Sequence, residues 1–199
     1  MYSIVYTQCK GRCVVANESI EPGTNLIIED PFSYVLFKDG TSVHDFNQRE
    51  LEILKLSYLN NPYMTVLASR VIKTYKLSNE NRQLLKKLCT SNHLFEDKYA
   101  TENEIKIVLY LLNNQEFDME YSSLIKSLSF NTFTIEDMEL KATGLGLYLQ
   151  GSAFNHSCDP NAYQTFVNEK LYIRSNQSIS KGDEICISYI GWLLIFIFF

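Results

Sequence analysis

The stretch GSAFNHSCDPNA, residues 151–162, places an asparagine, a histidine and a cysteine within four positions and then turns sharply. The Asp-Pro-Asn that follows favours a turn, because proline fixes φ and Asx side chains bond their own backbone. Asn155, His156 and Cys158 carry groups that bind ligands, hold metals or act as nucleophiles. The role of the stretch therefore depends on which other segments the fold brings to it.

A metal site is the first interpretation. His156 and Cys158 could supply two ligands, and Cys9 and Cys13 two more. Zinc needs four ligands that converge tetrahedrally, and the sequence does not show that these pairs meet. The spacing differs from that of a zinc finger, and no Cys-x-x-Cys pair is present. We therefore expect no bound metal.

Nucleophilic catalysis by Cys158 with His156 is the second interpretation. No third group marks an orienting partner for this pair, so this interpretation is weaker than the metal site. A phosphate-binding loop is excluded, because GLGLYLQG, residues 144–151, is not followed by Lys-Ser or Lys-Thr.

The overall composition predicts one globular domain that binds neither nucleic acid nor a membrane. The chain has 199 residues, of which 46% are hydrophobic, and a net charge of -5 that suits a basic peptide partner better than nucleic acid. Five scattered cysteines and no N-terminal apolar run predict the cytoplasm or nucleus. The apolar segment 191–199 reaches only about half the ~20 residues of a membrane helix.

Strand-like segments lie at both ends of the chain, and helix-like segments lie between them. Residues 12–37 and those after 129 are rich in β-branched and aromatic residues separated by turn signals. In the middle, Asn61 before Pro62 predicts a helix start, and Thr101 with Glu104 has the capping-box pattern. The sequence therefore predicts an α+β domain whose sheets are interrupted by a helical insertion.

Three segments together resemble a known family. NHSCDPNA is followed about thirty residues later by GDEICISYI, and the opening KGRCVVANESIEPGTNLIIEDPFSYVL resembles the first strands of the same domain. This combination is similar to SET-domain protein-lysine methyltransferases, and most similar to their SET-and-MYND (SMYD) subfamily. The resemblance covers most of residues 11–190, strongly at both ends and loosely through the helical middle.

The resemblance implies a fold of short twisted sheets with a pseudoknot, interrupted by a helical insertion. It assigns residues 1–190 to the SET domain and 191–199 to an atypical apolar C-terminus. Within the domain, the implied parts are an N-terminal β part at 1–43, a helical insertion at 44–128, and a C-terminal β part with the pseudoknot at 129–190.

The resemblance also implies an S-adenosylmethionine-dependent protein-lysine N-methyltransferase that acts as a monomer on a histone tail or another protein. Tyr189 would be the tyrosine at the methyl-transfer site. The side chain of Asn155 would bind the methionine part of the cofactor, and backbone groups of Asn155 and His156 would contact it or its adenine. The other implied cofactor-binding residues are Gly11, Arg12, Cys13 and Asn131.

Three departures from the family pattern bear on activity. Cys13 stands where the family usually has the second glycine of Gly-x-Gly, and residues 39–52 lack the cysteines of a MYND zinc finger. The resemblance stops at Ile190, before the post-SET segment that supplies an aromatic wall and the zinc partners of Cys158. We therefore expect weakened activity and no stoichiometric zinc, with a non-catalytic SET-fold module that binds cofactor or a protein partner as the alternative.

Overall fold

The chain folds into two units. The structure is a computed structural model that describes residues 1–8, 10–37, 45–57, 59–88, 102–113 and 119–190. One unit comprises residues 1–30 with 150–199, and the other comprises residues 31–149. The first unit is thus formed from both ends of the chain, and the second is one continuous segment.

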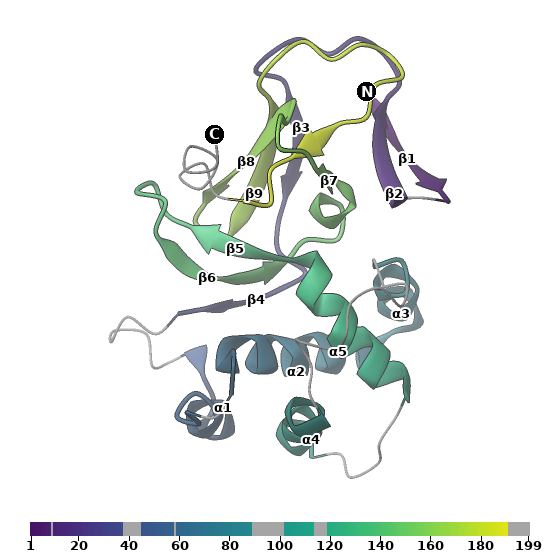
Figure 1. Ribbon diagram of the computed structural model, residues 1–199. Helices are drawn as coiled ribbons and strands as arrows, with labels where there is room; N and C mark the ends of the chain where they lie inside the picture. The colour runs from purple at the N-terminus through teal and green to yellow at the C-terminus, as the bar shows by residue number, and fades with distance from the viewer. Residues whose placement is uncertain (9, 38–44, 58, 89–101, 114–118, 191–199) are drawn as a thin grey trace. The chain divides into compact units, whose positions relative to one another are not determined.

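The first unit contains three small sheets (Figure 1). The antiparallel hairpin β1-β2 is the first, a three-stranded antiparallel sheet with the order β3-β9-β8 is the second, and the parallel pair β10-β7 is the third. Their elements are β1 Tyr2–Thr7, β2 Gly11–Ala16, β3 Asn25–Glu29, the 3-10 helix η2 Gly151–Ala153, β7 Asn155–His156, β8 Ala162–Val167, β9 Lys170–Ser175 and β10 Cys186–Ile187.

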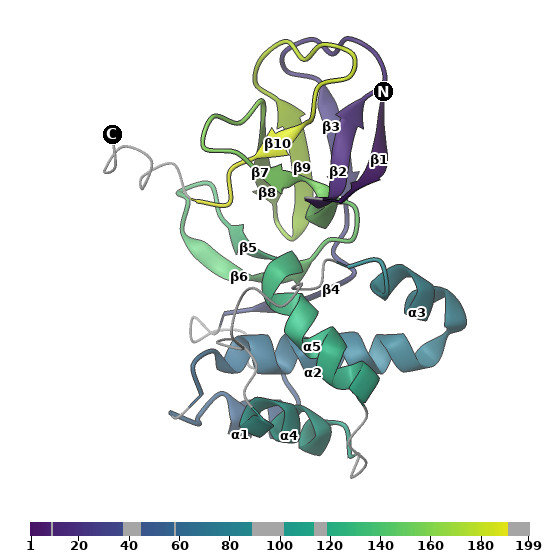
Figure 2. The same cartoon turned by 45° about the vertical axis from the view of Figure 1, so that its right-hand side comes forward.

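Residues 182–187 connect two of these sheets. The amide of Ile185 donates to the carbonyl of Val14 in β2 over 2.8 Å. The next two residues form β10, which pairs in parallel with β7, and Figure 2 shows the two strands side by side. The amide of Ser157 extends this pairing by donating to the carbonyl of Ile187 over 2.9 Å. One short segment therefore bonds to strands from the beginning and from the later part of the chain.

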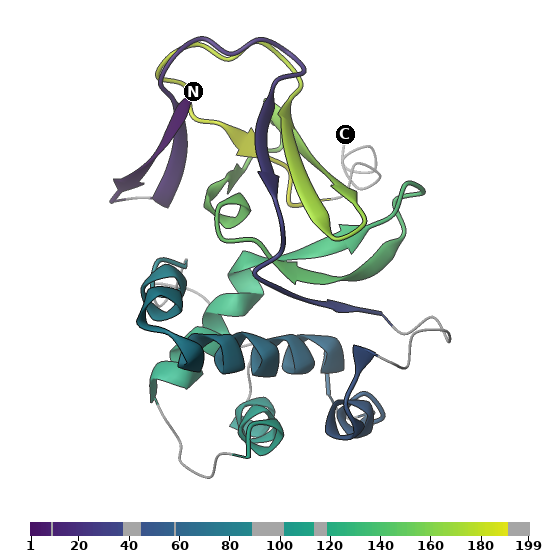
Figure 3. The same ribbon diagram turned by 180° about the vertical axis from the view of Figure 1, so that it is seen from behind.

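The second unit contains a sheet with helices packed on it. Its three antiparallel strands have the order β4-β6-β5, and α2 packs against β4 and β6. Figures 1 and 3 show α2 between this sheet and the helices α1 and α4. The elements are β4 Ser33–Leu36, α1 Gln48–Ile53, α2 Pro62–Leu77, α3 Asn79–Leu85, α4 Glu102–Leu111, α5 Met119–Asn131, β5 Thr132–Glu136 and β6 Ala142–Leu147.

Local sequence signals explain where α2 begins and which face it buries. The side chain of Asn61 accepts the amide of Met64 over 3.0 Å, and Pro62 occupies the first helical position. Val66, Val71 and Ile72 are fully buried. They belong to one apolar core with residues of β4, β6 and the other helices. The predicted start of this helix is confirmed.

Two glycines allow β6 to occupy the middle of its sheet. A β-carbon on Gly144 would lie 2.6 Å from the carbonyl oxygen of Val35, and one on Gly146 would lie 2.7 Å from the ring of Tyr148. Both distances are shorter than side-chain carbons tolerate, so only glycine fits here. The spacing of these glycines therefore reflects close packing.

The α+β class is confirmed, whereas some predicted element limits are wrong. Strands occur as predicted at the start of the chain and after residue 131, and helices lie between them. The strand predicted in EICISYI contains only Cys186–Ile187, because its partner β7 is two residues long. Asn131 ends α5 and directly precedes β5, so the helix extends past residue 129, where strand-like sequence was predicted to begin. The strands β1 and β6 were not predicted. The domain boundaries inferred from the resemblance stay a prediction.

Two of the sequence predictions concern residues outside the described part of the chain. Residues 191–199 and Thr101 lie outside the described residues. Within the described part of the chain, no helix is long and apolar enough to cross a membrane.

A buried ion pair joins α1 to α2 in the second unit. The carboxylate of Glu50 is 4% exposed and accepts from Nε of Arg70 over 3.0 Å and from its Nη2 over 3.2 Å. The same guanidinium donates to the carbonyls of Tyr34 and Asp45 over 3.0 and 2.7 Å. Arg70 therefore neutralises a buried charge and satisfies two backbone carbonyls, one of them in β4.

We expect Arg70→Met to lower the free energy of unfolding by about 3–5 kcal/mol, because it leaves the buried Glu50 carboxylate without its partner. Urea unfolding of the purified protein measures this loss. The matched control is Lys86→Met, whose ion pair with Glu120 is exposed and contributes below about 1 kcal/mol. Equal losses for the two variants would contradict this account of the ion pair.

Candidate functional site

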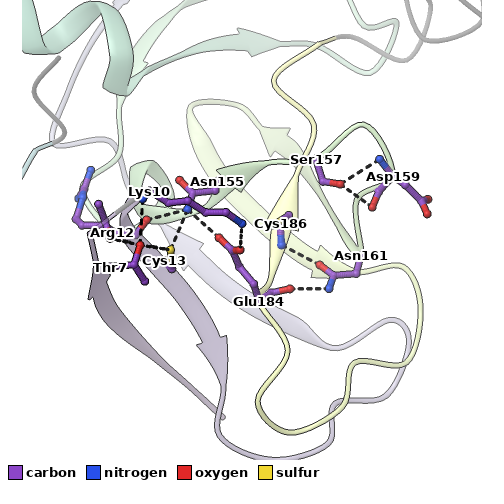
Figure 4. Close-up of polar contacts among 11 residues, drawn as sticks. Thr7, Lys10, Arg12, Cys13, Asn155, Ser157, Asp159, Asn161, Glu184 and Cys186 are labelled. Atoms are coloured by element: carbon purple, nitrogen blue, oxygen red, sulfur yellow. Dashed lines mark hydrogen bonds and ion pairs between the residues drawn. The ribbon is translucent and has the colours of Figure 1, made fainter. Parts of the chain in front are cut away.

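The side-chain amide of Asn155 lies where β2, β7 and residues 182–187 meet (Figure 4). Its Nδ2 is 2.8 Å from the carbonyl oxygen of Arg12, 2.8 Å from Oε1 of Glu184 and 3.3 Å from Sγ of Cys13. The three acceptors come from both ends of the chain. They hold the amide nitrogen toward the protein interior.

A short turn delivers Asn155 to this position. The carboxylate of Glu29 accepts the amides of Gln150 and Gly151 over 3.0 and 2.9 Å, which stabilises the start of η2. Nη2 of Arg12 donates to the carbonyl of Ser152 over 3.0 Å. These contacts link the turn before β7 to both β2 and the end of β3.

Gly11 and Cys13 differ in how they use the space around them. Gly11 has φ +70, a conformation that favours glycine, and a β-carbon built there would meet nothing within 4 Å. Cys13 is buried, 3% exposed, and its sulfur lies against Asn155 and 3.6 Å from Oγ1 of Thr7. The side chain that departs from the family's Gly-x-Gly pattern therefore contacts Asn155.

His156 contacts both Tyr189 and Cys158. Its Nδ1 accepts the backbone amide of Tyr189 over 3.0 Å, so the proton of the neutral ring is assigned to Nε2. Nε2 is 3.3 Å from Sγ of Cys158, and it can donate to that sulfur. The two side chains meet beside the turn that Ser157 and Asp159 close.

Tyr189 lies beside β7. Its hydroxyl donates to the carbonyl of Phe154 over 2.6 Å, and its ring centroid is 5.4 Å from that of His156. The residue is 59% exposed. The phenolic oxygen is thus held by the residue before Asn155 while much of the ring remains accessible.

Lys10 and Glu184 form a charged pair at the same place. Nζ of Lys10 is 2.6 Å from Oε2 of Glu184, whose other oxygen accepts from Asn155. Burial alone would raise the pKa of Glu184, but hydrogen bonds from Asn155, Lys10 and Cys13 outweigh it and leave this pKa below its ordinary value. Burial and the negative charge of Glu184 raise the pKa of Cys186. The carboxylate therefore stays ionised near neutral pH.

Asn161 fixes the backbone around Glu184. Its Nδ2 donates to the carbonyl of Glu184 over 2.9 Å, and its Oδ1 accepts the amide of Cys186 over 2.8 Å. The turn that follows the Asn-His pair is therefore bonded to both sides of Ile185. This contact gives the Asp-Pro-Asn sequence a structural role.

Asn131 belongs to the second unit and ends α5. It is 2% exposed, and its Nδ2 donates to the carbonyl of Ser127 over 2.6 Å. Its side chain therefore caps its own helix. The cofactor contact that the resemblance implies for Asn131 stays a prediction.

Six of the seven residues singled out in the sequence lie in the first unit. Hydrogen bonds join Arg12, Cys13 and Asn155, and His156 bonds to Tyr189. Gly11 precedes Arg12 in β2. Sequence reasoning missed Lys10 and Glu184, although both lie in the segments that carry the resemblance, KGRCVV and GDEICISYI.

No metal centre is evident in the part of the chain that the structure describes. In that part, no group of three or more His, Cys, Asp or Glu side chains is arranged to hold an ion. Cys9, one of the four residues considered as zinc ligands, lies outside the described residues. The expectation that the chain binds no zinc stays a prediction.

The sequence matches a known domain family and three kinds of curated relative. The SET domain profile matches residues 11–190. Mouse N-lysine methyltransferase SMYD2 is 32% identical over 137 aligned positions, covering 66% of this chain and 28% of the relative. Mouse histone-lysine N-methyltransferase SMYD3 is 29% identical over 216 aligned positions, covering 96% and 49%. Arabidopsis thaliana histone-lysine N-methyltransferase ASHR1 is 41% identical over 71 positions, covering 36% and 15%.

The matched relatives are much longer than this chain, which spans at most about half of their length. A crystal structure from Plasmodium falciparum aligns over 96% of both chains, with 16% identity and a TM-score of 0.39.

We expect Glu184→Gln to lower the free energy of unfolding at neutral pH by about 1.5 kcal/mol, the lower end for hydrogen bonds to charged groups. The folded pKa of Glu184 lies below 4.5, so its stabilisation is present above that value and is lost as the pH falls through the folded pKa. Urea unfolding between neutral pH and about pH 3 should therefore show the two proteins converging. A difference that stays constant over this range would contradict the assigned role of the carboxylate.

Proposed function

Because this chain belongs to the SET-domain family, we propose that it is an S-adenosylmethionine-dependent protein-lysine N-methyltransferase. The observation that carries the proposal is the hydrogen-bonded group of Arg12, Asn155, His156 and Tyr189 in the first unit. The family motifs contain all four residues, and Arg12 and Asn155 are 143 residues apart in the sequence. Their proximity supports a shared role.

The substrate that we propose is a lysine on a histone or another protein. Relatives named as N-lysine and histone-lysine methyltransferases support this class, although the chain spans only 28% and 49% of two of them. The net charge of -5 suits a basic peptide and argues against direct nucleic-acid binding. We expect a monomer that acts in the cytoplasm or nucleus.

The residues around Asn155 fit the amino-acid end of S-adenosylmethionine. Among the described residues, the hydrogen bonds of Asn155 are made by Nδ2, so Oδ1 is the atom that we expect to accept from the ammonium group. The space around Gly11 allows close approach of a ligand to the backbone. We assign cofactor contacts to Gly11, Arg12, Cys13, Asn155 and His156, and a further one to Asn131 on the resemblance alone.

When bound, S-adenosylmethionine would supply a methyl group attached to a positively charged sulfur. The chain's own residues then have to orient the lysine amine. The oxygen of Tyr189 donates its proton to Phe154, so its lone pairs can accept a hydrogen bond from an amine or a weak one from a polarised methyl group. We therefore assign to Tyr189 the catalytic role of orienting the amine.

The lysine must be uncharged to react, and its ordinary pKa is about 10.4. Removal of the amine from water lowers that pKa, because desolvation disfavours the charged form. A positive charge nearby acts in the same direction. This chemistry needs no dedicated base among the residues described here. It requires close control of position, which is worth about 7–11 kcal/mol in favourable cases.

We expect Asn155→Ala to weaken S-adenosylmethionine binding at least about tenfold, because a hydrogen bond to a charged group contributes about 1.5–3 kcal/mol. Isothermal titration calorimetry with the purified chain measures the affinity. Asn17→Ala is the matched control, since Asn17 is exposed and bonds only to Ser3 among the side-chain contacts described. Wild-type protein that shows no cofactor binding would refute the proposed cofactor.

We expect Tyr189→Phe to reduce methyl transfer about a hundredfold, as does removal of one oriented polar group in other active sites. Its cofactor affinity should remain nearly unchanged, because Tyr189 is assigned to the amine. Transfer from tritiated cofactor to histones and cell extract measures the first quantity, and calorimetry measures the second. Binding by the wild-type chain without any transfer would favour the non-catalytic SET-fold module.

A further inference from the structure

The orientation of the Asn155 amide is determined by its surroundings. An asparagine side chain has nearly the same shape in its two flipped orientations, but the flip exchanges two donor hydrogens for an acceptor oxygen. All three atoms near Nδ2 are acceptors: the carbonyl oxygen of Arg12, Sγ of Cys13 and Oε1 of Glu184. A flipped amide would place Oδ1 against the carbonyl oxygen of Arg12 and the carboxylate oxygen of Glu184, neither of which carries a hydrogen.

Glu184 is the acceptor whose charge makes this preference strong. A hydrogen bond to a carboxylate is roughly twice as strong as one between neutral groups. The side chain of Glu184 is 22% exposed, so solvent screens it only in part. Protonation would weaken the effect, but burial, which raises its pKa, is outweighed by hydrogen bonds from Asn155, Lys10 and Cys13 that lower it.

Glu184 is itself held from two sides. Lys10 binds its second carboxylate oxygen over 2.6 Å, and the backbone carbonyl accepts from Asn161. An isolated bridge pairs Glu184 with Val15 in β2. Lys10 therefore holds the carboxylate, while Val15 and Asn161 fix the backbone of Glu184, as Figure 4 shows for Lys10 and Asn161.

We propose that Glu184, held by Lys10, is a positioning residue that keeps the Asn155 amide oriented with Oδ1 toward the ammonium group of the bound cofactor. This inference rests on the proposed function, in which Asn155 binds the amino-acid end of S-adenosylmethionine. It adds a residue that touches no ligand atom and acts through its hydrogen bond to Asn155. Oδ1 directed at the ligand selects a donor such as an ammonium group and disfavours a carboxylate.

The test compares two ligands on three proteins by calorimetry. The ligands are S-adenosylmethionine and the analogue that lacks its α-amino group. The proteins are wild type, Glu184→Ala and the control Asp30→Ala, which removes an exposed ion pair with Lys170 in the same unit. We expect Glu184→Ala to weaken S-adenosylmethionine binding about tenfold, because the contribution of one hydrogen bond to a charged group is lost. Binding of the analogue should stay unchanged within about twofold. Asp30→Ala should match wild type with both ligands.

Equal weakening of both ligands by Glu184→Ala would indicate a merely structural role and overturn the inference. So would an unchanged affinity for S-adenosylmethionine. Glu184→Gln keeps an acceptor oxygen without the charge, so it should lie between wild type and Glu184→Ala. This variant also decides the matter if Glu184→Ala does not fold, by the same comparison of the two ligands.

A second measurement separates this inference from the cofactor assignment. In the ligand-free protein, nuclear magnetic resonance reports the two side-chain amide hydrogens of Asn155 directly. Hydrogen exchange at Nδ2 should become at least about tenfold faster in Glu184→Gln, because the charged acceptor is lost. Unchanged exchange would overturn the positioning role even if the cofactor binds. Faster exchange in a protein that binds neither ligand would support the orientation of Asn155 and refute only the cofactor assignment.

Discussion

The pairing of residues 182–187 with two separate strands is the constraint on which the first unit depends. Ile185 bonds to Val14 in β2, and the next two residues form β10 against β7. Because these strands come from opposite ends of the sequence, loss of this segment would leave β2 and β7 without a common partner. The contacts of Asn155 with Arg12 and the contacts of His156 with Tyr189 both require that arrangement.

Each unit contains a partly or fully buried carboxylate with a cationic partner, and these two carboxylates have different roles. Glu50 and Arg70 lie within the second unit, where the guanidinium also satisfies two backbone carbonyls. Glu184 and Lys10 lie beside an asparagine that the family motif singles out. A charge held among backbone groups stabilises a fold, whereas a charge held against an amide side chain controls which atom that amide presents.

Local sequence signals predicted the elements whose causes are local. Asn61 before Pro62 marks the start of α2, which the structure confirms. The signals failed where the cause lies in another segment: β6 contains glycines because Val35 and Tyr148 lie close to it. The family motifs predicted which site residues meet within the first unit. Glu184 was missed because its role appears only once its distances to Lys10 and Asn155 are known.

The ion pair of Lys10 and Glu184 joins residues that are 174 positions apart in the sequence. It can therefore form only late in the synthesis of the chain. During translation, residues 31–149 emerge as one continuous stretch and can begin to fold while the strands before them still lack their partners. The hairpin β1-β2 exposes Ile4, Val5 and Tyr6, and β2 gains its other neighbours only when residues 182–187 have left the ribosome. Contacts of such long sequence separation form slowly, so the N-terminal strands are the last to gain all their neighbours.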